Sequence, residues 1–230
     1  RQSQTFDELR KVELSYNTSP CLYFNPVPSG TTFDTAREPF RMSEGPVPEI
    51  PANIEDTAFW TVTDLSRALK AGRIRSLDLT KIYLDRLKRF DPVLKCVITL
   101  TEERALKQAA AADAEIAAGK YRGPLHGIPW GAKDLLSVKG YKTTWGAEPY
   151  KDQVIDEDAT VVQRLDAAGA VLVAKLSLGS LAQGDVWFGG RTNSPWNTKR
   201  GSSGSSAGPA AATSAGLVAF SIGSETNGSI

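Results

Sequence analysis

Helical patterns alternate with short apolar runs in the part of the chain that follows Thr63. The apolar runs predict buried strands at residues 96–100, 170–174 and 217–222. Apolar residues at helical spacing predict helices from Thr63, from Ser76 to Asp91-Pro92, and over 101–118, 159–168 and 210–215. Because helix-then-strand alternation builds sheets that helices cover, the pattern predicts an α/β fold.

Residues 1–60 have a different composition, with clustered prolines and glycines such as Asn25-Pro26-Val27-Pro28 and Gly45-Pro46-Val47-Pro48. Such clusters are turn and loop signals. We therefore divide the chain into an N-terminal arm, 1–60, and a domain, 61–230. We expect the arm to wrap a domain or to help association, for example in a homodimer.

The two ends of the chain carry their own expectations. The chain starts at Arg1 rather than at Met, which trimming or a removed signal peptide would explain, so both a cytoplasmic and an exported protein are compatible with it. It ends at Ile230, directly after a Gly/Ser-rich segment that resembles the start of a new element. We expect the chain to be the front part of a longer domain.

Composition argues against several classes of protein. Of 230 residues, 27 are Lys or Arg and 26 are Asp or Glu, and this formal charge of +1 gives no reason to expect a nucleic-acid partner. No apolar run approaches the ~18 residues that cross a bilayer, so we expect no membrane span. Cys21 and Cys96 fit neither a disulfide framework nor a zinc spacing, and His126 is the only histidine. We expect no metal and no cofactor.

The Gly/Ser-rich run at 201–208 has three possible interpretations. A flexible linker would normally separate domains, whereas this run leads directly into an apolar helix and strand. A phosphate-binding loop would need the Gly-Lys-Ser/Thr of a P-loop or the Gly-x-Gly-x-x-Gly of a dinucleotide fold, and both are missing. The third interpretation takes the run together with two other segments.

Those segments, 127–134 (GIPWGAKD), 204–208 (GSSAG) and 223–230 (GSETNGSI), together resemble the amidase signature family. The resemblance extends from about Thr61 to the end of the chain and is closer to the peptide-amidase-like branch. It implies a central mixed sheet with helices on both faces. In that family a lysine is the base, a serine in a cis peptide is a relay and a second serine is the nucleophile. The resemblance assigns these roles to Lys133, Ser205 and Ser229, and the interval between the two serines matches that of the family.

The chemistry of these residue types agrees with the assignment. A serine hydroxyl is a poor nucleophile until a base takes its proton. A lysine can be that base only when it is neutral, so burial must lower its pKa from ~10.4. Ile128, Trp130 and Ala132 give Lys133 an apolar setting, and we expect His126 to structure the loop before them. The resemblance further implies an oxyanion hole from the backbone N–H groups of Thr226, Asn227, Gly228 and Ser229.

Some positions depart from the common family pattern. Ser203 and Ala207 stand where flanking glycines are usual, but neither change removes a catalytic group. The loop after the 170–174 strand also differs, and in family members it borders the substrate. Substrate preference therefore does not transfer, although Leu178, Gly179 and Ser180 are candidates for contact with the substrate.

The sequence predicts an amidase that hydrolyses a linear carboxylic amide, such as an aryl amide or a peptide amide, or an ester, with a small molecule as its substrate. One alternative is the amidase-like component, the A subunit, of a tRNA-dependent amidotransferase, which shares the signature but works in a complex. The long arm before Thr61 and the near-neutral charge argue against it. A non-catalytic scaffold of the same fold is a further alternative, and the three intact catalytic positions argue against that one.

Overall fold

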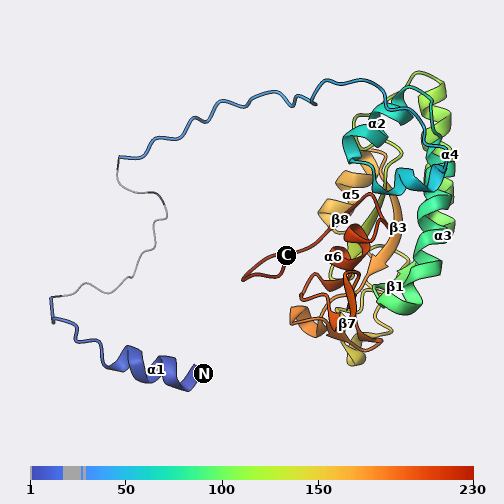
Figure 1. Cartoon of the computed structure of the whole chain (residues 1–230). Coiled ribbons are helices and arrows are strands. Elements are labelled where there is room, and N and C mark those ends of the chain that lie inside the picture. The colour runs from blue at the N-terminus through green and yellow to red at the C-terminus, as the bar shows by residue number, and fades with distance from the viewer. Residues whose placement is uncertain (1, 18–26, 28–29) are drawn as a thin grey trace. The chain divides into compact units, whose positions relative to one another are not determined.

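The computed structural model describes residues 2–17, 27 and 30–230 (Figure 1). The chain divides into two compact units, Arg1–Arg41 and Met42–Ile230. The first contains helix α1 (Gln2–Arg10), and the described residues from 30 to 53 form neither helix nor strand. The division at residue 60 suggested by the sequence stays a prediction.

A four-stranded mixed sheet is the centre of the second unit. Its strand order is β1 (Val97–Leu100), β3 (Val171–Leu176), β2 (Pro129–Lys133) and β8 (Phe220–Ile222). Strand β1 is antiparallel to β3, whereas β2 is parallel to both β3 and β8. Because parallel strands end at the same edge of a sheet, the residues that follow β2, β3 and β8 meet there.

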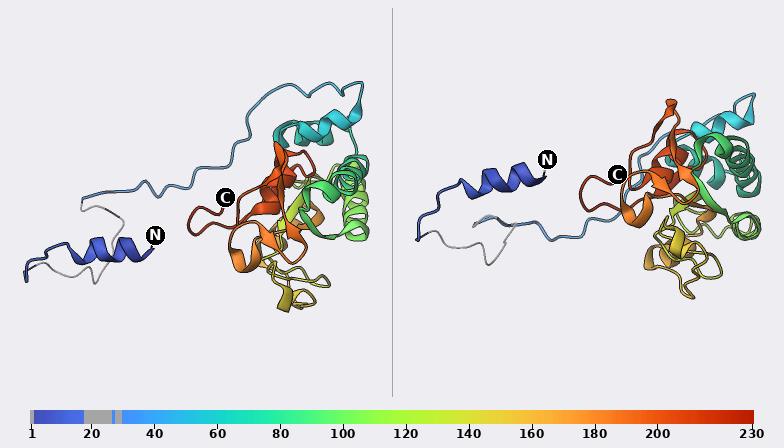
Figure 2. Two further views of the ribbon diagram at one scale, coloured as in Figure 1. Left: turned by 60° about the horizontal axis from the view of Figure 1, so that its bottom comes forward. Right: turned by 90° about the horizontal axis from the view of Figure 1, so that it is seen from below.

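Helices cover both faces of this sheet. Helices α3 (Ser76–Leu94) and α4 (Glu102–Ala117) lie side by side and share one apolar cluster with β3 and with α6 (Ala207–Ser214) (Figures 1 and 2). Helix α5 (Thr160–Ala167) packs against Trp130, Ala132 and Leu172 on the other face. The expected mixed sheet with helices on both faces is confirmed.

A third apolar cluster joins the start of the second unit to α3. It contains residues of helix α2 (Val62–Lys70) and of the 3-10 helix η1 (Ile54–Phe59). The smaller elements are η2 (Glu148–Tyr150), η3 (Ser180–Ala182), and the pairs β4 (Val186–Trp187) with β5 (Gly190–Arg191) and β6 (Asn193–Ser194) with β7 (Asn197–Gly201).

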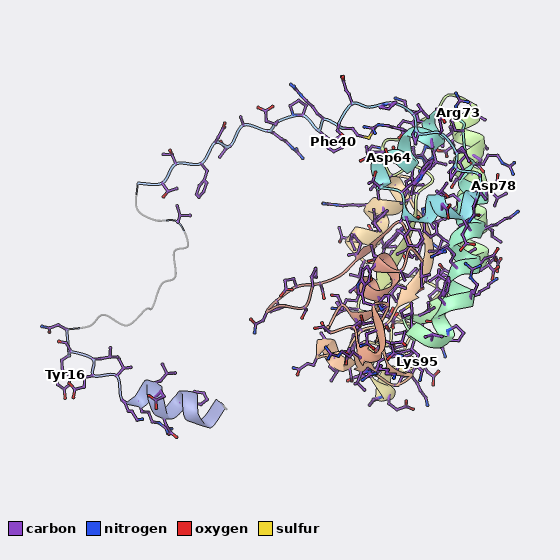
Figure 3. The ribbon with its side chains drawn as sticks, in the orientation of Figure 1. Tyr16, Phe40, Asp64, Arg73, Asp78 and Lys95 are labelled. Atoms are coloured by element: carbon purple, nitrogen blue, oxygen red, sulfur yellow. The ribbon has the colours of Figure 1, made fainter. Side chains whose placement is uncertain are left out.

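Helix α3 is longer than the sequence predicts. Asp78 lies near its start and Lys95 directly after its end, at opposite ends of the long helix in Figure 3. The helix does not stop at Asp91 but continues through Pro92 to Leu94. The carboxylate of Asp91 accepts the backbone N–H groups of Cys96 and Val97, at 2.7 and 2.8 Å, and so stabilises the exit from the last turn.

Two further observations concern the described residues only. None of their helices is long and apolar enough to cross a membrane, and their His, Cys, Asp and Glu side chains form no group that could hold a metal ion. Cys96 is buried with a free thiol, and Cys21 lies outside the described residues.

Candidate active site

Lys133 is the last residue of β2, a central strand of the sheet, and it is fully buried. Side chains alternate between the two faces of a strand. Trp130 and Ala132 belong to the cluster on the α5 face, so Lys133 points to the opposite face, where α6 lies. Burial lowers the pKa of Lys133, and the nearby carboxylate of Glu225 raises it by a smaller amount.

Three serine hydroxyls surround the Nζ atom of Lys133. The Nζ–Oγ distances are 2.8 Å to Ser205, 3.0 Å to Ser206 and 2.8 Å to Ser224. Ser206 and Ser224 also contact each other, because the Ser224 N–H donates to Ser206 Oγ at 3.2 Å. The sequence singled out Ser205 alone, so the structure adds Ser206 and Ser224 to the group.

Ser205 lies in the loop that leads into α6. The Gly204–Ser205 peptide bond is cis, as the resemblance implied, and Ser205 is buried. The first turn of α6 rests directly on the chain that follows β3, where the Gly208 N–H donates to Ser177 O at 2.9 Å. A Cβ atom on Gly208 would lie 2.4 Å from Ser177 N, so only glycine permits this approach.

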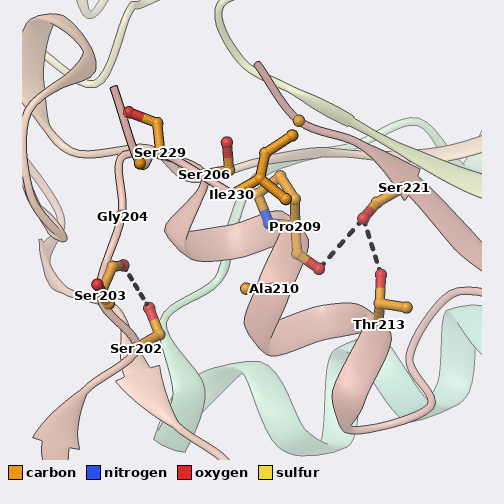
Figure 4. Close-up of a pocket in the computed structure, with 12 residues that line it drawn as sticks. Ser202, Ser203, Gly204, Ser206, Pro209, Ala210, Thr213, Ser221, Ser229 and Ile230 are labelled. Carbon is orange, nitrogen blue, oxygen red and sulfur yellow. Dashed lines mark hydrogen bonds between the residues drawn. The ribbon is translucent and has the colours of Figure 1, made fainter. Parts of the chain in front are cut away.

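Ser229 lies beside this group without joining its hydrogen bonds. It follows β8 and lines a pocket of about 350 Å³ together with residues of the Ser205 loop, among them Ser203, Gly204 and Ser206 (Figure 4). The Ser206 N–H donates to Ser229 O at 3.0 Å. Among the described residues, however, the Ser229 hydroxyl makes no hydrogen bond to Ser205 or Lys133. The structure therefore brings Lys133 and Ser205 together and leaves Ser229 next to them.

The turn expected to form an oxyanion hole faces a carboxylate of its own chain. Glu225 accepts the backbone N–H groups of Gly228 and, at 2.7 Å, of Ile230. Desolvation raises the pKa of Glu225, but hydrogen bonds from the backbone N–H groups of the turn lower it overall. The N–H groups of this turn thus converge on a negative charge, which is the property that an oxyanion hole needs.

The remaining substrate-contact candidates from the sequence, Leu178, Gly179 and Ser180, lie in the loop next to Ser205. The Gly179 N–H donates to Ser205 O at 3.2 Å, which places the loop of Leu178, Gly179 and Ser180 beside Ser205. These three residues do not line the pocket in Figure 4, and their contact with a substrate stays a prediction. His126 is buried in the loop before β2, where its Nδ1 accepts the Arg122 N–H at 3.2 Å.

A lysine buried among serines, at the carboxyl edge of a mixed sheet with helices on both faces, defines an α/β protein with a candidate serine–lysine site. The chain belongs to the amidase family, since the Amidase family model matches residues 78–230. The resemblance noted from the three segments is thereby confirmed.

Relatives of known function differ among themselves. Over 173 residues the chain is 42% identical to the A subunit of the glutamyl-tRNA(Gln) amidotransferase of Methylococcus capsulatus, an alignment that covers 74% of this chain and 36% of the relative. The solved peptide amidase from Stenotrophomonas maltophilia is 38% identical, with a TM-score of 0.71 over 76% of this chain and 38% of that one. A fatty acid amide hydrolase is 28% identical, with a TM-score of 0.73 over 78% and 32%. The chain therefore spans well under half of the length of these proteins.

Proposed function

We propose that the protein is an amidase that hydrolyses a linear carboxylic amide through an acyl-enzyme on Ser229. One observation carries the proposal: a lysine and a serine, both buried, are hydrogen-bonded at 2.8 Å at the edge of the sheet where Ser229 also lies. A buried lysine with a lowered pKa is the kind of group that can act as a base near neutral pH.

Acylation begins with proton transfer. Neutral Lys133 accepts the proton of Ser205 while Ser205 accepts the proton of Ser229, and Ser229 Oγ forms a bond to the carbonyl carbon. The carbonyl oxygen becomes negative and is stabilised by the N–H groups of the turn at 226–229. The C–N bond then breaks as the leaving nitrogen takes the proton that Lys133 returns through Ser205.

Deacylation follows the same path with water in place of Ser229. Water gives a proton to Ser205, which passes its own proton to Lys133. The water oxygen then attacks the acyl carbon. The bond to Ser229 Oγ breaks, Ser229 regains the proton that Lys133 returns through Ser205, and the acid leaves. For the first step the Ser229 hydroxyl must come within ~2.6–3.2 Å of Ser205. The oxyanion must also replace the carboxylate of Glu225 at the Gly228 N–H.

A fluorophosphonate, which reacts covalently with activated serines, tests the proposal on the purified protein. We expect an adduct on Ser229, identified by mass spectrometry of the labelled peptide. Ser229→Ala should abolish labelling and turnover. Ser205→Ala should slow both by ~10²–10⁴-fold, the usual contribution of a proton-transfer group, yet leave slow labelling at Ser229. An adduct on Ser205 in the wild-type protein, with Ser229 free, would reverse the assignment.

A second candidate function is that of the amidase-like component of a tRNA-dependent amidotransferase. The observation in its favour is the 42% identity to such a component of a glutamyl-tRNA(Gln) amidotransferase. The peptide amidase supports the first candidate with a similar sequence identity of 38%. Turnover distinguishes them: a protein that cleaves a small linear amide by itself is an amidase, whereas one that acts only with co-purified partner proteins is the alternative.

A further inference from the structure

A buried ion pair lies behind Lys133, on the other face of the sheet. Lys175 Nζ is 2.6 Å from Asp134 Oδ1, and neither side chain has any exposed surface. Asp134 directly follows Lys133, so by alternation its side chain points away from the serines, toward the α5 face. Removing two charges from water is costly and often yields no net gain in stability. The pair therefore calls for a role other than stabilising the fold.

Both members of the pair hold the loop at 142–145. Asp134 Oδ2 accepts the N–H and the hydroxyl of Thr144, at 2.7 and 2.5 Å. Lys175 Nζ donates to Lys142 O at 2.8 Å and to Thr143 Oγ1 at 3.3 Å. With these contacts the two buried charges fix one segment of the loop from two sides.

That loop is connected in turn to the segment beside Ser205. The backbone O of Trp145 accepts the Leu181 N–H at 2.9 Å, and the Gly179 N–H of the same segment donates to Ser205 O at 3.2 Å. The ion pair is also connected to β2. The Asp134 N–H donates to Leu176 O at 2.8 Å, which fixes the end of β2 immediately after Lys133. The pair thus lies between the strand that carries Lys133 and the segment that supports Ser205.

We infer that Asp134 and Lys175 are positioning residues that keep Lys133 and Ser205 within hydrogen-bond reach of each other. The inference rests on the proposed function of these two residues. Neither charge contacts the substrate: they act through the backbone of β2 and through the loops at 142–145 and 179–181. A displacement of about 1 Å between reacting groups costs up to ~10²-fold in rate, so a small shift of either element is measurable.

The test uses the double variant Asp134→Asn/Lys175→Met, which removes both buried charges and leaves no unpaired one. The readout is the first-order rate constant for fluorophosphonate labelling of Ser229 at saturating probe. Loss of folded protein lowers the extent of labelling but not this constant. We expect the constant to fall about 10- to 100-fold.

A control variant, Asp166→Asn, changes an ion pair at the opposite end of β3, where Asp166 contacts Arg104 at 2.5 Å and Gln108 at 2.8 Å. Its rate constant should equal that of the wild-type protein. A double variant with the wild-type constant overturns the inference. If the double variant does not fold, Thr144→Val removes the hydroxyl that donates to Asp134 and accepts the Gly146 N–H, and it keeps both charges. It should lower the constant about 3- to 10-fold, and an unchanged constant again overturns the inference. Failure of the wild-type protein to label at Ser229 would instead overturn the proposed function, and this inference with it.

Discussion

The three hydroxyl partners of Lys133 suit both protonation states of its amine. A neutral amine has two N–H donors and one lone pair, and an ammonium has three donors. A hydroxyl can donate or accept, so Ser205, Ser206 and Ser224 can satisfy either form by rotating their O–H bonds. A carboxylate in the same place would favour the charged form only. The proton can therefore arrive and leave without an unpaired buried group.

Ser224→Ala tests this arrangement at the residue scale. It removes a partner at 2.8 Å from Lys133 Nζ, and we expect the labelling rate constant at Ser229 to fall about 10-fold, the effect of ~1.4 kcal/mol. Ser221→Ala is the matched control, because Ser221 lines the pocket beside Ser229 but its hydroxyl bonds to Thr213 and Pro209 instead of Lys133 (Figure 4). Equal effects of the two substitutions would contradict the role of Ser224.

The charge of Glu225 gives a prediction about pH. Lys133 acts as a base only when neutral, so the labelling rate falls as pH drops through its pKa. Burial lowers this pKa and the carboxylate of Glu225 raises it. Glu225→Gln removes the raising effect, so the midpoint of the acid limb should move to lower pH, as measured by labelling rate constants across pH.

Glu148→Gln is the control for this measurement, because Glu148 pairs with Lys151 at the surface. Its midpoint should match that of the wild-type protein. A midpoint that moves to higher pH in Glu225→Gln, or does not move, would show that Glu225 does not act on the base.

At the scale of elements, the sequence predicts the long helices and the strands β1, β3 and β8, but not the central strand β2. The long helices and β3 have clear periodic or apolar patterns. The sequence gives no strand pattern for β2, since Pro129 and Gly131 are poor strand formers. It is a strand because it is paired on both sides, by β3 and β8. Tertiary pairing of this kind overrides local propensity.

The sequence also predicts only part of the candidate site. The resemblance singled out Lys133, Ser205 and Ser229 because they stand in recognisable segments. Ser206 and Ser224 stand in the same segments, but one serine among several carries no signal of where its hydroxyl points. The role of Glu225 at the turn was equally hidden, because its hydrogen bonds depend on how the chain folds back on itself.

Arg86 offers a stability prediction for the elements around α3. Its buried guanidinium donates to Gly216 O at 2.7 Å and Ala215 O at 2.8 Å, after the end of α6, and pairs with Glu55 of η1. Arg86→Met leaves both carbonyls without this donor, so the free energy of unfolding should fall by roughly 2–4 kcal/mol in urea denaturation. Arg75→Met, which breaks an exposed pair with Asp78, should change it little. Similar losses in the two variants would contradict the anchoring role of Arg86.

At the scale of the whole molecule, the candidate site is assembled from segments that are distant in the chain. The parallel strands β2, β3 and β8 bring residue 133, the segment at 177–181 and the turn at 223–230 to one edge. Helix α6 begins at the same edge, directly after Ser205 and Ser206. The sheet topology thus explains why the three segments with amidase-like sequence occur so far apart.

The unequal distribution of buried residues predicts where a protease cuts first. All three apolar clusters are formed by residues between Ile50 and Ile222, whereas Arg37 and Arg41 are exposed and lie outside any helix or strand. Trypsin needs a locally extended chain, and the helices of the second unit must unfold to supply one. We therefore expect mass spectrometry of a digestion time course to show cuts at or before Arg41 first, followed by a persistent 42–230 product. Digestion in urea should remove this order. Early cuts within α3 or α4 under native conditions would contradict the assignment of the stable core to the second unit.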